Sequence, residues 1–297
     1  FNITNFSFLI FSIYFLIYKI LNKKSLISNI TKVLCILSAI LLLSKFSRLA
    51  EYGTDISGQI LIILSTIIAS ELFNKKKFLL DKDNYLLLLI LLIFAITIKV
   101  YFIIFLVFPL LIFLKFNYKK KILNLIILPK NFFIMIIPML FLILFNFSST
   151  GCLVYPISFT CFPNFADWGI ELDAIKYLNT HYELWAKAGR TPNLSIENPE
   201  KYLSELSWIL NWYENYFISK VSDFLLVILT IIIIFSLFFY GQLFSKNKLK
   251  KIKLSINFYL FYFLYVFLFL FWFFNFPQLR YGGYVILFFL FTIPFSF

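Results

Sequence analysis

The sequence predicts an all-α protein: a polytopic bundle of transmembrane helices with one small exterior loop domain. Hydrophobic residues make up 62% of the 297 positions. Charged residues make up only 14%, whereas soluble domains carry roughly 25%. The apolar residues form repeated segments close to the roughly 20 residues that a helix needs to cross a bilayer. These segments lack the polar and apolar alternation of a membrane β-barrel, which leaves helices as the predicted spanning elements.

Short lysine-rich connections predict how the segments are oriented. Four of them lie beside apolar runs, at residues 19–32, 75–82, 115–130 and 246–253. The positive-inside rule places all four on the cytoplasmic side. The net charge of +13 is therefore interpreted as a matter of orientation and anionic headgroups, with no nucleic-acid partner.

This orientation predicts about nine membrane segments and divides the chain into three parts. An N-terminal bundle at 1–147 includes a short exterior loop at 48–57, an exterior loop domain follows at 148–220, and further transmembrane segments occupy 221–297. Both ends, Phe1 and Phe297, look cut from a longer protein, so we expect additional segments. The nine segments are residues 6–21, 30–46, 57–73, 85–98, 100–114, 132–147, 221–244, 254–274 and 284–297.

Two of these segments are short and meet near Lys99. One helix through both would place the lysine clusters at 75–82 and 115–121 on opposite sides of the membrane. Two short helices joined near Lys99 keep both clusters inside. Lys99 then lies at an exterior apex beside Tyr101, where its ammonium group either reaches the headgroups or neutralises a lipid phosphate.

Polar chemistry gathers on the predicted exterior side, and most densely at residues 48–59. There Glu51 or Asp55 could act as a base on a hydroxyl group while Arg48 holds a phosphate. A purely structural interpretation is equally available, with Asp55 capping the next helix and Glu51 paired to Arg48. A second exterior connection contains Arg280 and Tyr281, followed by two glycines that permit close backbone approach.

The loop domain contains two cysteines, Cys152 and Cys161, whose spacing and predicted oxidising compartment favour a disulfide. A metal site is not expected there, because thiolate sites usually bring further Cys or His and His181 is the only histidine. We predict helices at 168–179, 182–188 and 199–212, with Asn198 as the N-cap of the last one.

Four blocks carry a resemblance to known proteins: residues 48–55, 151–162, 184–189 and 280–284. Together they resemble a family of bacterial polytopic inner-membrane proteins associated with surface-polysaccharide assembly. More distantly, the layout is similar to GT-C glycosyltransferases, which use polyprenyl-phosphate-linked sugars at the exterior membrane face. That similarity implies a multi-pass protein of the bacterial inner membrane with its active face periplasmic or exterior.

The GT-C similarity also implies a catalytic acid in the first exterior loop, where Glu51 and Asp55 are the counterparts. Arg48, Lys99 and Arg280, with Tyr101 and Tyr281 beside them, would bind the phosphate. The implied partners are the lipid bilayer, a polyprenyl-phosphate-linked sugar donor and a glycan acceptor. The paired acids of that superfamily, Asp-Asp or Glu-Asp, are missing from the sequence, so a divalent-metal cofactor is left open.

We therefore expect a membrane glycosyltransferase and retain two alternatives. A repeat-unit polymerase of the O-antigen type would use the arginines on a lipid pyrophosphate without needing the carboxylates. A transporter or flippase of lipid-linked or anionic solutes predicts charges in the middle of spans, whereas here most charges lie at span ends.

Overall fold

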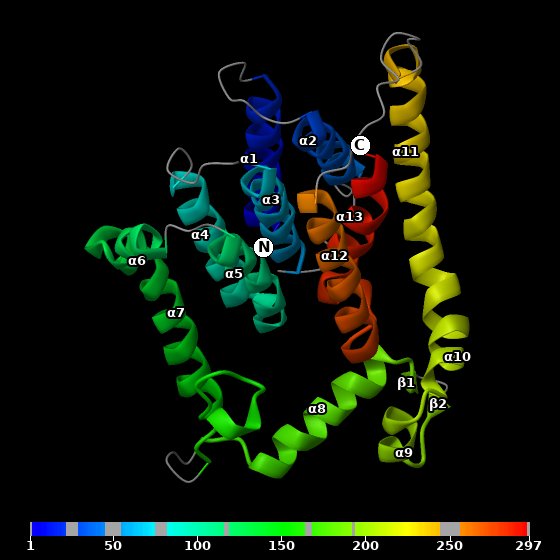
Figure 1. The fold of residues 1–297 in the computed structure, drawn as a ribbon. Helices are drawn as coiled ribbons and strands as arrows, with labels where there is room; N and C mark the ends of the chain where they lie inside the picture. Colours follow the sequence, from blue (N-terminus) through cyan, green and yellow to red (C-terminus); the bar gives the residue numbers. More distant parts are fainter. Residues whose placement is uncertain are drawn as a thin grey trace.

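Helices account for nearly all of the fold (Figure 1). The computed structural model describes residues 2–21, 29–44, 55–74, 82–115, 119–163, 168–191, 194–243 and 256–295. Within these ranges the only strands are β1 (Arg190–Thr191) and β2 (Leu194–Ser195), which pair as a small antiparallel hairpin. The predicted all-α class is therefore correct.

The helices form two groups, those of the bundle and those that lie between residues 150 and 222 in the sequence. The first group comprises α1 (Asn2–Leu21), α2 (Asn29–Ser44), α3 (Asp55–Asn74), α4 (Lys82–Ile98), the 3-10 helix η3 (Val100–Leu106), α5 (Val107–Lys115), α6 (Lys119–Ile127), α7 (Pro129–Thr150), α11 (Ser222–Leu243), α12 (Ile256–Asn275), the π-helix η6 (Leu279–Gly283) and α13 (Tyr284–Phe295). The second comprises the 3-10 helix η4 (Ser158–Thr160), α8 (Leu172–Ala186), α9 (Pro199–Ser204), α10 (Trp208–Trp212) and the π-helix η5 (Tyr213–Val221).

Helix α3 forms the centre of the bundle. It contacts α1, α2, α4, α5, α12 and α13, and every residue from 57 to 73 is buried. A helix that is apolar on all faces is expected to be enclosed by neighbours in this way. Gly58 allows the closest approach, because a Cβ atom at this position would run into the ring of Phe102 from η3.

Among the described residues, four helices are long and apolar enough to cross a membrane by length and composition. They are Asp55–Asn74, Pro129–Thr150, the continuous run Trp208–Phe238 and Ile256–Asn275. Four shorter apolar helices accompany them, at Asn5–Leu21, Ile30–Ser44, Val100–Lys115 and Leu279–Phe295. Each of the nine predicted segments overlaps a helix, while the count of nine spans stays a prediction.

The break that the sequence predicts near Lys99 is present. Helix α4 ends at Ile98, and Lys99 has extended backbone angles, φ −152° and ψ 113°, before η3 begins. Two short helical pieces therefore meet at one charged residue, which stands where the chain changes direction.

Several boundaries differ from the sequence-based expectation. One helix, α8, replaces the two expected at 168–179 and 182–188, because its residues 172–186 continue without a break. Helix α7 extends to Thr150, and η5 leads directly into α11, so neither edge of the expected loop domain at 148–220 coincides with a helix end. Helix α6 lies within residues 115–130, which the sequence predicts to be a lysine-rich connection.

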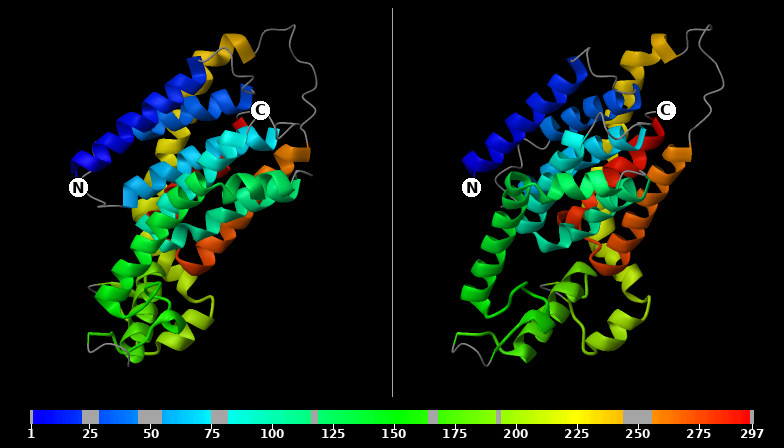
Figure 2. Two further views of the ribbon diagram at one scale, coloured as in Figure 1. Left: turned by 90° about the vertical axis from the view of Figure 1, so that its left-hand side faces the viewer. Right: turned by 60° about the vertical axis from the view of Figure 1, so that its left-hand side comes forward.

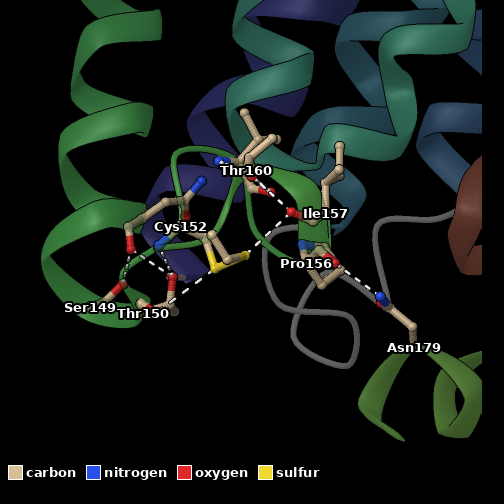
Figure 3. The surroundings of a disulfide bond; sticks show 10 residues. Ser149, Thr150, Cys152, Pro156, Ile157, Thr160 and Asn179 are labelled. Atoms are coloured by element: carbon tan, nitrogen blue, oxygen red, sulfur yellow. Dashed lines mark hydrogen bonds between the residues drawn. A yellow bond between two sulfur atoms is a disulfide. The ribbon is translucent and has the colours of Figure 1, made fainter. Parts of the chain in front are cut away.

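Residues 151–163, 168–191 and 194–207 lie at one end of the bundle (Figure 1), and the last turns of α1 and α11 lie at the opposite end (Figure 2). Cys152 and Cys161 are joined by the expected disulfide. Figure 3 shows how this loop is held: Asn179 of α8 donates a hydrogen bond to the carbonyl oxygen of Pro156 at 3.0 Å. Asn198 caps α9 as expected, its Oδ1 accepting from the amide of Lys201 at 3.1 Å.

Candidate functional site

Three charged side chains from distant parts of the chain meet where α3 begins, α4 ends and η6 turns. The Lys99 ammonium lies 3.0 Å from Asp55 Oδ1, and Arg280 Nε lies 3.3 Å from Asp55 Oδ2. The second contact is an ion pair without a hydrogen bond, because Arg280 Nε has no aligned acceptor among the described residues. One carboxylate thus lies between two cations.

Each of the three residues stands at an interruption in the helical structure. Asp55 is the first residue of α3, Lys99 is the extended residue between α4 and η3, and Arg280 belongs to the π-helical turn η6. In that turn Gly282 has φ +82°, a conformation that side-chain-bearing residues rarely adopt. Gly283 lets the turn approach Trp272, since a Cβ atom there would lie 2.6 Å from the indole ring.

Hydrogen bonds to backbone carbonyls fix the turn that carries Arg280. The Arg280 carbonyl accepts from Lys99 Nζ at 3.2 Å and from Gln59 Nε2 at 3.3 Å. The indole nitrogens of Trp212 and Trp272 donate to Pro277 and Gln278 at 2.7 and 2.8 Å. The position of the Arg280 backbone is therefore set by four side chains from other elements or from the preceding helix.

Aromatic rings surround the cations. The ammonium group of Lys99 lies 4.1 Å from the ring centre of Tyr281, within cation–π range. The guanidinium carbon of Arg280 lies 5.4 Å from the same ring and 5.8 Å from the ring of Trp185. Tyr101 packs edge-on against Tyr281, and its buried hydroxyl has no hydrogen-bond partner among the described residues.

The two cations, Lys99 and Arg280, differ in how far they are exposed. The side chains of Lys99 and Asp55 are 14% and 17% exposed, whereas Arg280 is 42% exposed. Burial lowers the pKa of Lys99, an effect that the neighbouring Asp55 carboxylate opposes. Lys99 is thus engaged by Asp55 and a carbonyl oxygen, whereas the terminal nitrogens of Arg280 form no hydrogen bond or ion pair with the described residues.

A cavity of about 280 Å³ opens beside Arg280. Its lining includes one more cation, Lys220, and three aromatic side chains, Trp185, Tyr216 and Tyr284. The chemistry that this arrangement can provide is anion binding next to a carboxylate. Its lining consists of Trp185, Ala188, Asn215, Tyr216, Lys220, Gln278, Arg280 and Tyr284.

The structure brings together five of the seven residues expected at the site: Asp55, Lys99, Tyr101, Arg280 and Tyr281. The other two, Arg48 and Glu51, lie outside the described residues. The disulfide is a separate feature of the loop domain. Lys99 differs from the expected phosphate ligand, because its ammonium group is engaged within the protein.

Sequence reasoning missed the residues that support and extend the site. Gln59 lies in the polar stretch that attracted attention, but nothing in the sequence indicates that it would reach Arg280. Lys220 and Trp185 line the cavity, and the sequence indicates no role for either at this site. Only their meeting at one cavity distinguishes them.

Within the described ranges, no three His, Cys, Asp or Glu side chains lie close enough together to hold an ion. His181 lies on α8 between the rings of Tyr177 and Tyr182. These contacts are those of a packed surface histidine.

Comparison with known proteins places the chain in a family. The profile of the family described as "Domain of unknown function (DUF8201)" matches residues 1–287. No curated protein sequence and no solved structure matches the chain. Because the matched residues span nearly the whole sequence, the chain belongs to the DUF8201 family.

Proposed function

We propose that this chain is an integral-membrane glycosyltransferase that moves a sugar from a polyprenyl-phosphate donor to an exterior glycan acceptor in surface-polysaccharide assembly. The single observation that carries the proposal is the Asp55, Lys99 and Arg280 cluster, with a half-exposed guanidinium beside a cavity. This arrangement supplies a carboxylate and a phosphate-binding group in one place.

The proposed reaction needs both groups. The acceptor hydroxyl oxygen attacks the anomeric carbon, the bond from that carbon to the phosphate oxygen breaks, and polyprenyl phosphate leaves. Asp55 takes the hydroxyl proton, because each carboxylate oxygen keeps a free lone pair beside its ion-pair contact. Arg280 binds the departing phosphate through its terminal nitrogens, where the developing negative charge is stabilised.

Lys99 acts as a positioning residue in this mechanism. Its ammonium group joins the carboxylate of Asp55 to the backbone oxygen of Arg280, so it sets the distance between base and phosphate ligand. The three side chains carry a net charge of +1, which matches the single negative charge of a sugar phosphodiester.

One observation favours a second candidate, a repeat-unit polymerase of the O-antigen type. Asp55 contacts both cations, so it could serve only to hold them in place. The polymerase would then bind a lipid pyrophosphate through Arg280 without using a base.

The Asp55→Asn variant separates these two functions, because an amide oxygen can still accept from Lys99 but cannot take a proton. In cells that lack the native copy, we expect Asp55→Asn and Arg280→Gln each to abolish surface-glycan assembly. Asp173→Asn, at an exposed acid of helix α8, serves as an acid-to-amide control. Assembly that persists in Asp55→Asn but is lost in Arg280→Gln would favour the polymerase.

A further inference from the structure

A second, apolar cavity lies between α11 and α13. Its volume is about 650 Å³, and its lining is almost entirely hydrocarbon, with Ser236 as the one polar side chain. Such a surface takes a hydrocarbon chain. Its walls include Leu225, Leu229, Ile232 and Ile233 of α11 and Phe291 and Phe295 of α13.

The apolar cavity follows the polar cavity along α13 and along the continuous helix that η5 and α11 form together. Tyr284 lines the polar cavity, and Phe291, seven residues further along α13, lines the apolar one. Seven residues are two helical turns, so both rings occupy the same face of α13. On the other helix, Lys220 lines the polar cavity and Leu225 begins the apolar one.

One aromatic contact links the two helices between these cavities. Phe224 packs edge-on against Tyr284 with ring centres 4.8 Å apart. A polar pocket and an apolar groove therefore follow one another along one pair of helices. The natural occupant of this arrangement is an amphipathic molecule that has one polar end.

The polar end must be anionic. Arg280 and Lys220 both line the polar cavity, and Lys220 forms no ion pair among the described residues. Two cations around one cavity suit a phosphate group. The half-exposed ring of Trp185 in the same wall can stack on a sugar attached to that phosphate.

We propose that α11 and α13 bind one single-chain polyprenyl phosphate lipid. Its phosphate lies between Lys220 and Arg280, and its chain occupies the groove lined by Leu229 and Phe291. This inference rests on the proposed function and specifies how its donor is held. A single groove favours a single-chain lipid over a diacyl phospholipid, which has two chains to place.

The test uses the purified full chain in phosphatidylcholine nanodiscs, with undecaprenyl phosphate as the probe and phosphatidylglycerol as the competing anionic lipid. Native mass spectrometry measures the lipid retained per protein. We expect undecaprenyl phosphate to be retained against about a tenfold excess of phosphatidylglycerol, because both lipids offer charge but only one fits the groove.

Two pairs of variants locate the site. Leu229→Trp fills the groove, whereas Leu226→Trp changes an exposed leucine on the same helix that does not line it. Lys220→Gln removes the cavity cation, whereas Lys176→Gln changes an exposed lysine paired with Asp173 on α8. We expect Leu229→Trp and Lys220→Gln to weaken retention by about tenfold, a loss typical of one important contact, and both controls to match the wild type.

Two results would overturn the inference. Equal retention of phosphatidylglycerol would indicate ordinary boundary lipid. Wild-type retention of undecaprenyl phosphate by Leu229→Trp would indicate that the lipid does not occupy the groove. Either result leaves the proposed function standing if Asp55→Asn still abolishes glycan assembly. Conversely, selective retention of undecaprenyl phosphate together with full glycan assembly by Asp55→Asn supports the lipid site and contradicts the transferase.

Discussion

The ammonium group of Lys99 lies 3.0 Å from the carboxylate of Asp55, although 44 positions separate the two residues in the chain. The same nitrogen donates to the backbone oxygen of Arg280, 181 positions further on. One lysine thus connects the start of α3, the break after α4 and the turn before α13. This connection brings charges from distant parts of the chain together into a candidate site.

Lys99→Met should unfold more easily than the wild type. The change leaves the largely buried Asp55 carboxylate without its lysine partner, which costs about 3 kcal/mol for a buried pair. Thermal unfolding in detergent measures the loss. The double variant Lys99→Met/Asp55→Asn should recover only part of the lost stability, because Asp55→Asn also removes the ion pair with Arg280. A double variant less stable than Lys99→Met would argue against this pairing.

Lys19 and Glu71 provide a matched ion pair away from the site. Their charged atoms lie 2.6 Å apart between α1 and α3, near the end of α3 opposite to Asp55. We expect Lys19→Met to lower stability by a comparable amount, about 3 kcal/mol, while the protein that folds keeps its activity. If Lys19→Met and Lys99→Met lost activity to the same extent, both ion pairs would affect activity only through stability.

Gly283→Ala should damage the turn that holds Arg280. An added Cβ would lie 2.6 Å from the Trp272 ring, whose nitrogen donates to the carbonyl of Gln278. Overpacking of this kind costs about 1–3 kcal/mol, and it should also displace Arg280. Thermal unfolding and glycan assembly, measured together, test this expectation; a variant with wild-type values for both would show that the turn tolerates the shift.

The disulfide gives a test of both stability and side. Cys152 and Cys161 are nine positions apart, and closing so short a loop contributes about 2–3 kcal/mol in the chain-entropy model. Changing both cysteines to serine should therefore lower the unfolding temperature. Because both thiols are buried, the side is tested with Phe159→Cys, a change at an exposed residue of the same loop, in a background without the three native cysteines. A membrane-impermeant maleimide added outside should label it, and labelling only from the cytoplasmic side would reverse the predicted topology.

Local signals in the sequence predicted the elements that depend on nearby residues. The lysine clusters indicated the break at Lys99, Asn198 and Pro199 indicated the start of α9, and the cysteine spacing indicated the disulfide. The helix start and the disulfide are each decided within a few residues, whereas the break at Lys99 follows from the lysine clusters at 75–82 and 115–121 on either side of it.

Features that depend on packing between distant helices could not be predicted. Helices such as α12 and α13 are apolar on every face, so periodicity does not indicate which face meets which neighbour. The contact of Gln59 with the Arg280 turn and the place of Lys220 at the cavity follow from that packing. The sequence likewise contains no local signal that indicates one continuous helix from Trp208 to Phe238.

The most direct test of the central claim is sugar transfer by purified protein. Wild type and Asp55→Asn, matched for folding by thermal unfolding, are supplied with a polyprenyl-phosphate-linked radiolabelled sugar and a glycan acceptor. The account predicts transfer by the wild type and a loss of about 100-fold or more in Asp55→Asn, as expected when a general base is removed. Transfer by Asp55→Asn at the wild-type rate would contradict it.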